Sequence, residues 1–179
     1  DGESTYLRLS TRAVRQVERS DDGWKAAALA GGYWLREPGP GTEGLGAEAA
    51  IVAMGAVMPE ALAAWEELAA DVPGLGLLNV TSPDLLHRGW SSAQAARWGG
   101  ERAPSHVELL LGRLGAGAGL VTICDAAPAS LSWLGGVCGQ RVAPLGVDRF
   151  GQTGTLAELY AAYRLDGRAI TQAVAELLL

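Results

Sequence analysis

Short apolar runs that alternate with helix-type segments place the strongest constraint on how this chain folds. Residues 49–54 form a continuous apolar run, and residues 75–80 and 119–124 form two further runs of similar length. Such runs are typical of strands that are buried on both faces of a parallel sheet. Apolar residues at helical spacing occur over residues 59–70, after the first run, and over residues 104–114, after the second run. The alternation predicts an α/β fold with a doubly wound, mostly parallel sheet.

Turn and cap signals extend this pattern in both directions. Residues 32–36 read as a strand that leads into a loop rich in Gly and Pro instead of a helix, so this strand is expected to run antiparallel. Residues 141–145 read as the last strand. Together the elements predict a three-layer α/β/α domain with a mostly parallel five-stranded sheet and one antiparallel strand. Further helical segments are expected after Ser82 and Pro83, after a capping box at Ser91 and Gln94, over 129–137, over 156–163 behind a capping box at Thr155 and Glu158, and from about Asp166.

The first 22 residues differ from the rest of the chain. Residues 5–10 alternate between polar and apolar as a strand does, and the polar residues 12–22 read as a linker. We therefore divide the chain into the end of a preceding domain with its linker, residues 1–22, and one domain over residues 23–179. Because the chain opens on Asp1 without Met, we expect a processed or excised piece of a longer product.

The charge balance argues against several classes of partner. The net charge is −6, and Lys25 is the one lysine of the chain. Nucleic-acid binding needs clustered Lys and Arg side chains that neutralise phosphates, so no nucleic-acid partner is expected. No apolar run reaches the length of about 18 residues that a membrane-spanning helix needs, so no membrane span is expected. No signal peptide is recognisable at the start, and we expect a cytoplasmic protein.

Signals for nucleotide, hydrolytic or metal chemistry are weak. A Rossmann turn needs the G-x-G-x-x-G pattern, whereas Gly55 is the one glycine at the first strand-to-helix turn. Ser82, Asp84 and His87 are the residue types of a hydrolase triad, but they crowd into one helical turn. That spacing favours a Ser cap beside two solvated side chains. The two histidines have no suitable carboxylate pair beside them, so no metal site is expected.

Cysteine and tryptophan residues favour structural roles. Cys124 and Cys138 lack CxxC spacing and have no nearby His, so we expect two buried thiols and no zinc site. The six Trp residues are expected in the core or at an interface, where large apolar surfaces are covered.

A block near the end of the sequence resembles a family signature. Residues 146–153 fit the pattern G-x-D-x-F-G-x-[ST], between an expected strand and the two helices that finish the chain. This block is similar to the closing signature of the C-terminal domain of transketolase-family thiamine-diphosphate enzymes. The resemblance implies a structural or interface role for the matching positions, which are Gly146, Asp148, Phe150, Gly151 and Thr153.

Other blocks resemble the same family in the same order along the chain. Residues 50–55 and 60–64 are similar to the strand, G-[ST]-G turn and E-A helix of that domain. Residues 80–86 resemble the V-T-S-x-x-E-L block of the homodimeric pyruvate dehydrogenase decarboxylating component. Residues 6–12 look like the end of the family's middle, pyrimidine-binding domain, so residues 1–22 are assigned to that domain and its linker. The sequence departs from the family pattern at Ala53, at residues 99–102 and at residues 125–128.

The resemblance carries expectations about cofactors and partners. It implies that thiamine diphosphate and Mg²⁺ are bound by other domains of the complete enzyme, and that this chain is inactive alone. It also implies packing against the cofactor-binding domains or subunit, support of a homodimer and of the active-site channel, and association with a lipoyl acyltransferase complex. Thr11 and Arg12 correspond to a place near the substrate channel, and a guanidinium suits an anionic carboxylate or phosphate. The alternative for Arg12 is a solvated linker residue.

Three hypotheses for function follow from these observations. The first is the C-terminal domain or subunit of a thiamine-diphosphate-dependent 2-oxo acid dehydrogenase of the pyruvate dehydrogenase type, or of a transketolase. The second is a non-catalytic interaction or regulatory module that reuses the fold. The third, an independent Rossmann-type nucleotide binder, is the least favoured because the glycine pattern is missing.

Overall fold

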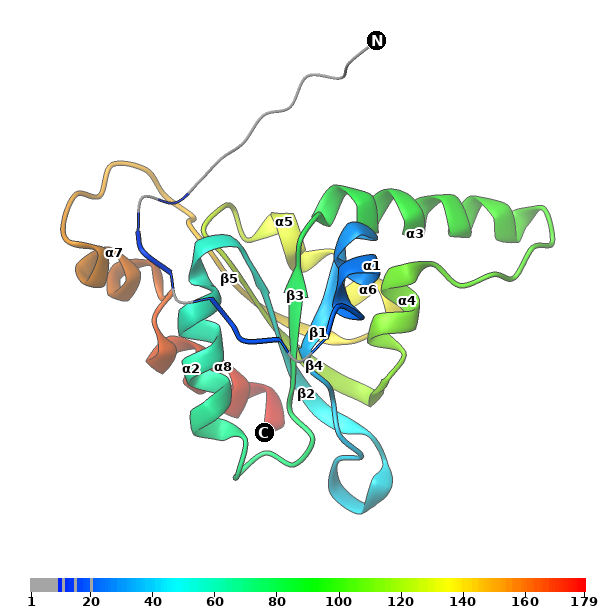
Figure 1. The fold of residues 1–179 in the computed structure, drawn as a ribbon, viewed down its shortest axis with the longest axis horizontal. Coiled ribbons are helices and arrows are strands. Elements are labelled where there is room, and N and C mark those ends of the chain that lie inside the picture. Colours follow the sequence, from blue (N-terminus) through cyan, green and yellow to red (C-terminus); the bar gives the residue numbers. More distant parts are fainter. Residues whose placement is uncertain (1–9, 11, 15, 20) are drawn as a thin grey trace, which may run out of the picture.

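A five-stranded sheet forms the centre of the computed structural model, which describes residues 10, 12–14, 16–19 and 21–179 (Figure 1). The strands lie in the order β1-β3-β2-β4-β5. Strand β1 pairs antiparallel with β3, and the pairs β2·β3, β2·β4 and β4·β5 are parallel. The expected fold class, including its antiparallel strand, is therefore confirmed. The strands are Gly32–Arg36 (β1), Ala47–Met54 (β2), Gly76–Val80 (β3), Leu114–Cys124 (β4) and Arg141–Leu145 (β5).

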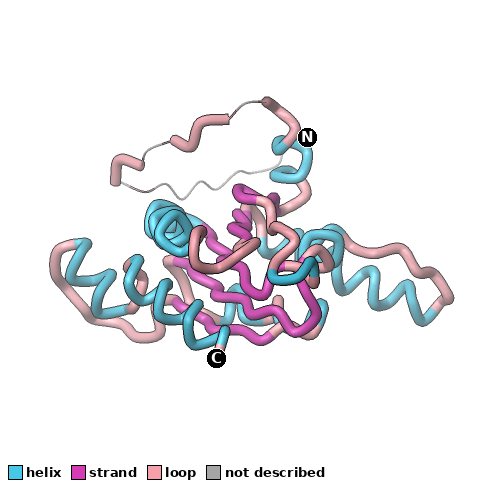
Figure 2. Tube along the Cα trace, turned by 90° about the horizontal axis from the view of Figure 1, so that it is seen from below, coloured by secondary structure: helices cyan, strands magenta, loops and turns pink. Residues whose placement is uncertain are grey.

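Helices cover both faces of this sheet, as Figure 2 shows. The bounds of the longer helices are Met58–Leu68 (α2), Pro83–Trp98 (α3), Leu156–Tyr163 (α7) and Gly167–Leu178 (α8). The shorter ones are Trp24–Leu29 (α1), His106–Leu111 (α4), Ala129–Ser132 (α5) and Gly135–Cys138 (α6), with 3-10 turns Thr42–Gly44 (η1) and Gly55–Val57 (η2). No helix of the described residues is long and apolar enough to cross a membrane.

Alternate residues of the central strands point into two separate cores. Ile51 packs with α2 and α8 on one face, where Ile170 is fully buried. Val52 packs on the opposite face with Leu86 of α3 and Leu111 of α4. Because neighbouring side chains of a strand point to opposite faces, a purely apolar run such as β2 is buried on both. This confirms the reading of the apolar runs as central strands.

Capping interactions fix where three of the helices begin. Ser105 and Glu108 form a capping box at the start of α4, and Thr155 and Glu158 form the expected one at the start of α7. The Asp166 side chain accepts a hydrogen bond of 2.8 Å from the amide of Ala169 at the start of α8. Such caps satisfy amides that have no partner within the helix, which explains why helices start at these polar residues.

Several expected boundaries differ from the observed ones. The segments expected on either side of Ser91 form one continuous helix, α3, which runs through Gly89 without a break. The segment 129–137 divides into α5 and α6, where an added Cβ at Gly135 would lie 2.6 Å from Val142. Strand β4 begins at Leu114, which had been assigned to a helix. Helix α1 follows the linker at a place where no helix was expected. The strand expected over residues 5–10 lies almost wholly outside the described residues.

Candidate functional site

The carboxyl ends of the two central strands, β2 and β4, define the point where the sheet topology reverses. The connection after β2 leads to β3 on one side, and the connection after β4 leads to β5 on the other. In open α/β sheets a crevice forms at such a switch point and commonly binds ligands. Here β2 ends at Met54 and β4 ends at Cys124, and these two residues are register partners. Gly55 and Asp125, the next residues along, therefore lie side by side.

Gly55 gives Asp125 room to approach the first strand-to-helix turn. Its φ angle is +83°, and an added Cβ would lie 2.4 Å from the Asp125 Oδ1 atom. The positive φ angle disfavours a residue with a side chain, and a Cβ would also make the Asp125 side chain move. The backbone conformation of this turn therefore favours the glycine, which gives it a structural reason that is independent of any nucleotide.

Arg12 forms an ion pair with a residue of the adjacent helix. Its Nη1 atom donates a 2.7 Å hydrogen bond to Oε1 of Glu60, in the first turn of α2. The Arg12 side chain is 33% exposed and that of Glu60 is 17% exposed. The guanidinium also lies 5.9 Å from the centre of the Tyr160 ring of α7. Arg12 is therefore held against the domain surface, which weighs against a freely solvated linker residue.

The electrostatics of this cluster follow from partial burial of opposite charges. The hydrogen bond to Glu60 raises the pKa of Arg12 above its ordinary value, so the guanidinium stays charged. Burial, followed by the negative charge of Glu60, raises the pKa of the Tyr160 phenol. The second carboxylate oxygen of Glu60, Oε2, is buried without a hydrogen-bond partner among the described residues. The cluster combines one fixed cation with a phenol that remains protonated at neutral pH.

The signature turn is anchored to the end of β4 at its first residue. An added Cβ at Gly146 would lie 2.6 Å from the carbonyl oxygen of Ala126 and 2.9 Å from the nitrogen of Pro128. The amide of Val147 donates a 2.9 Å hydrogen bond to the same Ala126 carbonyl. Gly146 directly follows β5, and it therefore lies close beside the residues that follow the end of β4.

The outer part of the turn rests on α7 and presents its remaining side chains to solvent. The Arg149 guanidinium donates a 2.8 Å hydrogen bond to the carbonyl of Ala162, and the Tyr163 hydroxyl donates one of 2.9 Å to the carbonyl of Arg149. Phe150 is fully exposed. Every residue of α7 is likewise at least partly exposed. The other signature positions on the exposed turn are Asp148, Gly151 and Thr153.

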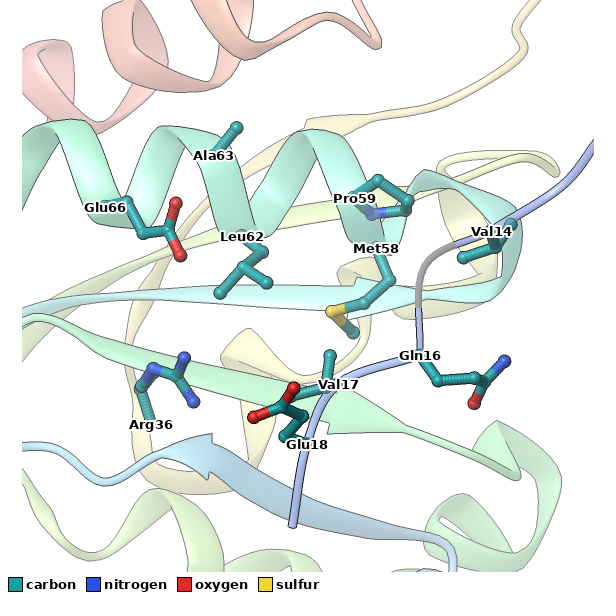
Figure 3. Close-up of a pocket in the computed structure, with 10 residues that line it drawn as sticks. All are labelled: Val14, Gln16, Val17, Glu18, Arg36, Met58, Pro59, Leu62, Ala63 and Glu66. Carbon is teal, nitrogen blue, oxygen red and sulfur yellow. The ribbon is translucent and has the colours of Figure 1, made fainter.

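A groove lies between the leading segment (described residues of 12–22) and α2 (Figure 3). Its volume is about 360 Å³. Figure 3 shows the charged side chains of Glu18, Arg36 and Glu66 near one end of the groove. Met58 and Pro59 lie toward the other end, where α2 begins. The groove therefore has its charged side chains at one end, while the lining of the other end is apolar apart from Gln16.

The triad-like residue types do not assemble into a hydrolytic site. The Ser82 hydroxyl donates a 2.6 Å hydrogen bond to Asp84, and this bond lowers the pKa of the Asp84 carboxyl. His87 instead lies edge-on to Trp133, with ring centres 4.9 Å apart. The expected Ser cap is wrong, because the Ser82 hydroxyl contacts Asp84 and makes no hydrogen bond to a helix amide.

The two thiols differ in exposure. Cys124 is buried at the end of β4, whereas Cys138 is exposed at the end of α6. The expectation of two buried thiols is therefore wrong for Cys138, because α6 is a short surface helix beyond the covered part of the sheet. No group of three His, Cys, Asp or Glu side chains that could hold a metal ion occurs within the part of the chain that the structure describes.

The structure joins Arg12 to residues that sequence reasoning did not select. Glu60 and Tyr160 are brought to Arg12 by α2 and α7, which lie far apart in sequence. Asp125 directly follows the apolar run 119–124, and the carboxyl end of a strand in a parallel sheet is where ligand-binding side chains commonly lie. Thr11, the other expected channel residue, lies outside the described residues.

Comparison with known proteins identifies the fold. No family model and no curated protein matches the sequence. Among solved structures, a split-gene transketolase, described as an inactive beta4 tetramer, is 20% identical, with a TM-score of 0.58 over 83% of this chain. Transketolase from Leishmania mexicana is 17% identical, with a TM-score of 0.57 over 89% of this chain. Transketolase from Campylobacter jejuni is 14% identical, with a TM-score of 0.55 over 82%.

These likenesses establish an architecture that is shared with transketolases. The chain has the α/β fold of the transketolase C-terminal domain. It spans 42% of the split-gene chain, 19% of the Leishmania mexicana chain and 18% of the Campylobacter jejuni chain. The match therefore concerns one domain of much longer proteins.

Proposed function

We propose that this chain is the C-terminal domain, or a separately encoded C-terminal subunit, of a thiamine-diphosphate enzyme of the transketolase class. The observation that carries this proposal is the likeness to several transketolase structures over more than four fifths of the chain. The order of the family-like sequence blocks supports the same assignment. The complete enzyme would transfer a two-carbon unit, or decarboxylate a 2-oxo acid as pyruvate dehydrogenase does.

The existence of a split-gene transketolase supports the version with two subunits. This chain spans 42% of that structure's chain, a larger share than of the other transketolases. A separately encoded piece of the enzyme would then assemble with a second subunit that carries the remaining domains. The alternative is one long chain that contains all the domains.

The residues of this chain fit a supporting role better than a cofactor-binding one. The described residues bring together no set of side chains suited to Mg²⁺. The turn at Gly55 lies against the Asp125 side chain and lacks the G-x-G-x-x-G pattern of a diphosphate-binding turn. The proposal therefore assigns thiamine diphosphate and Mg²⁺ to the other domains, and no chemical step is derived for this chain.

The contribution proposed for this chain is contact with its neighbours. The exposed turn around Phe150, together with α7, is the surface we assign to packing within the enzyme and its homodimer. Thr11 and Arg12 are assigned to the border of the substrate channel, where the fixed guanidinium would attract an anionic substrate. Association with a lipoyl acyltransferase and a cytoplasmic location belong to the pyruvate dehydrogenase version of the proposal.

The native mass of the gene product in its own cell extract tests the proposal first. A product several times larger than 18.5 kDa that contains thiamine diphosphate supports the single-chain version. A product of 18.5 kDa that co-purifies with a thiamine-diphosphate-binding subunit supports the two-subunit version. A product of 18.5 kDa that binds no such subunit, even when the purified components are mixed, contradicts both versions. That result would leave the interaction or regulatory module as the function.

A further inference from the structure

The groove between the leading segment and α2 is built around one positioned guanidinium. Arg36 ends β1, and its guanidinium lies 5.2 Å from the centre of the Trp65 ring. The indole is itself fixed, because Trp65 Nε1 donates a 2.7 Å hydrogen bond to the carbonyl of Leu75. One nitrogen of Arg36 donates to the Leu35 carbonyl at 3.1 Å. This support holds the guanidinium in place while further donors remain for a ligand.

Two carboxylates face the same end of the groove from opposite walls. Glu18 comes from the leading segment and Glu66 from α2, and Figure 3 shows both near Arg36. Among the described residues, no ion pair joins either carboxylate to that guanidinium. The polar end therefore carries separated charges of both signs that do not neutralise one another by direct contact.

Apart from Gln16, the remaining lining residues of the groove are apolar. Val14 and Val17 line it from the leading segment, and Met58, Pro59 and Leu62 line it from α2 (Figure 3). Ligand sites typically combine apolar walls with a few polar groups that fix orientation, within volumes of roughly 300–1,000 Å³. The groove, at about 360 Å³, lies at the small end of that range.

From this arrangement we infer that the groove binds a small zwitterion, a free α-amino acid with an aliphatic side chain. Its carboxylate is paired with Arg36, its ammonium group lies between Glu18 and Glu66, and its side chain contacts Met58 and Leu62. A simple carboxylic acid would leave two negative side chains facing its own charge. A simple amine would leave the guanidinium without a partner. Only a ligand with both charges complements the polar end of the groove.

This inference goes beyond the proposed function, because it concerns the isolated chain and uses no residue assigned to the channel or the signature turn. Its test is a binding measurement that needs no enzymatic activity. Failure of the binding test would leave the assignment to a thiamine-diphosphate enzyme untouched, and failure of that assignment would leave the groove in place.

Titration calorimetry of the 179-residue chain with three related probes tests the inference. L-leucine carries both charges, 4-methylpentanoate lacks the ammonium group, and 3-methylbutylamine lacks the carboxylate. We expect saturable binding of L-leucine with a Kd below about 1 mM. Each single-charge probe should bind about tenfold or more weakly, because one charged hydrogen-bonding interaction is lost. No saturable binding of leucine, valine, isoleucine or methionine, or equal binding of all three probes, would overturn the inference.

Variants locate the binding in the groove. Glu66→Gln changes an exposed side chain on α2 and should weaken L-leucine binding about tenfold without altering the fold. Glu67→Gln, on the same helix but outside the groove, is the matched control and should leave the affinity unchanged. Arg36→Gln should abolish detectable binding, with circular dichroism used to verify folding. Equal affinity of the Glu66→Gln variant and the parent chain would place the binding elsewhere and overturn the assignment.

Discussion

Gly55 and Asp125 lie against each other where the two central strands end, with 2.4 Å between a Cβ built on the glycine and the aspartate Oδ1. The Asp125 side chain, at the end of β4, thus occupies space beside the first strand-to-helix turn that a Cβ at residue 55 would need. This contact brings the switch point of the sheet close to the ion pair of Arg12 and Glu60, since Glu60 lies in the helix that the turn begins.

Replacing Gly55 by alanine should therefore destabilise the domain. The added methyl group meets the Asp125 side chain. In addition, the backbone at this position has a φ angle of +83°, which a residue with a side chain rarely adopts. We expect a loss of about 1–3 kcal/mol in the free energy of unfolding, measured by urea denaturation. Gly89→Ala is the control, because Gly89 lies within α3 and the described residues leave open space around it. That change should stabilise the helix by about 0.5–1 kcal/mol, so equal effects of both substitutions would contradict the explanation.

The capping box of α4 should make stability depend on pH. Burial alone would raise the pKa of Glu108, but hydrogen bonds from the hydroxyl and amide of Ser105 and from Arg97 outweigh it and lower the pKa. The stabilisation is therefore complete above the unfolded-state pKa of about 4.3 and is lost as pH falls through the lower folded-state value. Glu108→Gln should cost about 1–2 kcal/mol near neutral pH.

The difference between wild type and Glu108→Gln should shrink when unfolding is measured near pH 3. Glu101→Gln serves as the reference substitution, because Glu101 is an exposed carboxylate in the loop before α4. A gap between wild type and Glu108→Gln that is equally large at acidic and neutral pH would mean that the charge of Glu108 is not what stabilises the cap.

Arg12→Ala should impair substrate use in the complete enzyme. If the guanidinium borders the channel, its loss should raise the KM for an anionic substrate by about tenfold and change kcat less. Glu60→Gln separates charge from position, because it keeps an acceptor for Arg12 and removes the negative charge beside it. Unchanged steady-state kinetics of Arg12→Ala would remove this residue from the channel and leave it a docking role for the leading segment.

Phe150→Ala should separate assembly from folding. Because Phe150 is fully exposed, its removal should change the free energy of unfolding of the isolated chain by less than about 0.5 kcal/mol. At a buried interface the same truncation should weaken association with the cofactor-binding subunit by about tenfold or more. Leu45→Ala is the control, as Leu45 is also exposed but precedes the amino end of β2, whereas Phe150 follows the carboxyl end of the parallel strand β5. Identical association constants for the two variants would exclude the signature turn from the interface.

The two thiols should react at very different rates with a disulfide reagent such as Ellman's reagent. Cys138 is exposed and should be modified in the folded chain, whereas Cys124 is buried and should react only after unfolding. Burial raises the pKa of both thiols, so the assay is best run at mildly alkaline pH. Cys138→Ser should abolish the fast phase. Rapid modification of both thiols in the native chain would show that the β4 end opens readily.

The fold was largely predictable because its strongest signals are local in sequence. The apolar runs predicted the bounds of β2 and β3 to within one or two residues. The Thr155–Glu158 capping box predicted α7 with its observed bounds. Boundaries were wrong where the deciding contact is tertiary. Gly135, the first residue of α6, packs closely against Val142 of β5, and this contact leaves no mark in the local pattern.

The candidate site was predictable only in part, for a related reason. Arg12 was selected by its resemblance to a family position, but its partner Glu60 comes from a distant helix and is fixed by the sheet order. The groove beside Arg36 likewise needs three separated segments in place before it exists. Sequence motifs report chemistry within one segment, whereas these features depend on contacts between segments.

The position of β1 at the sheet edge bears on how the chain folds as it is synthesised. Of the strands in this sheet β1 is made first, yet its pairing partner is β3, which is made only after the whole of β2 and α2. The central pair of β2 and β4 must wait longer still, until α3 and α4 have been produced. Closing such long loops before strands can pair slows folding. The growing chain must therefore keep β1 and β2 unpaired until β3 arrives, and one side of β2 unpaired until β4 arrives, a period in which chaperones would have the most to protect.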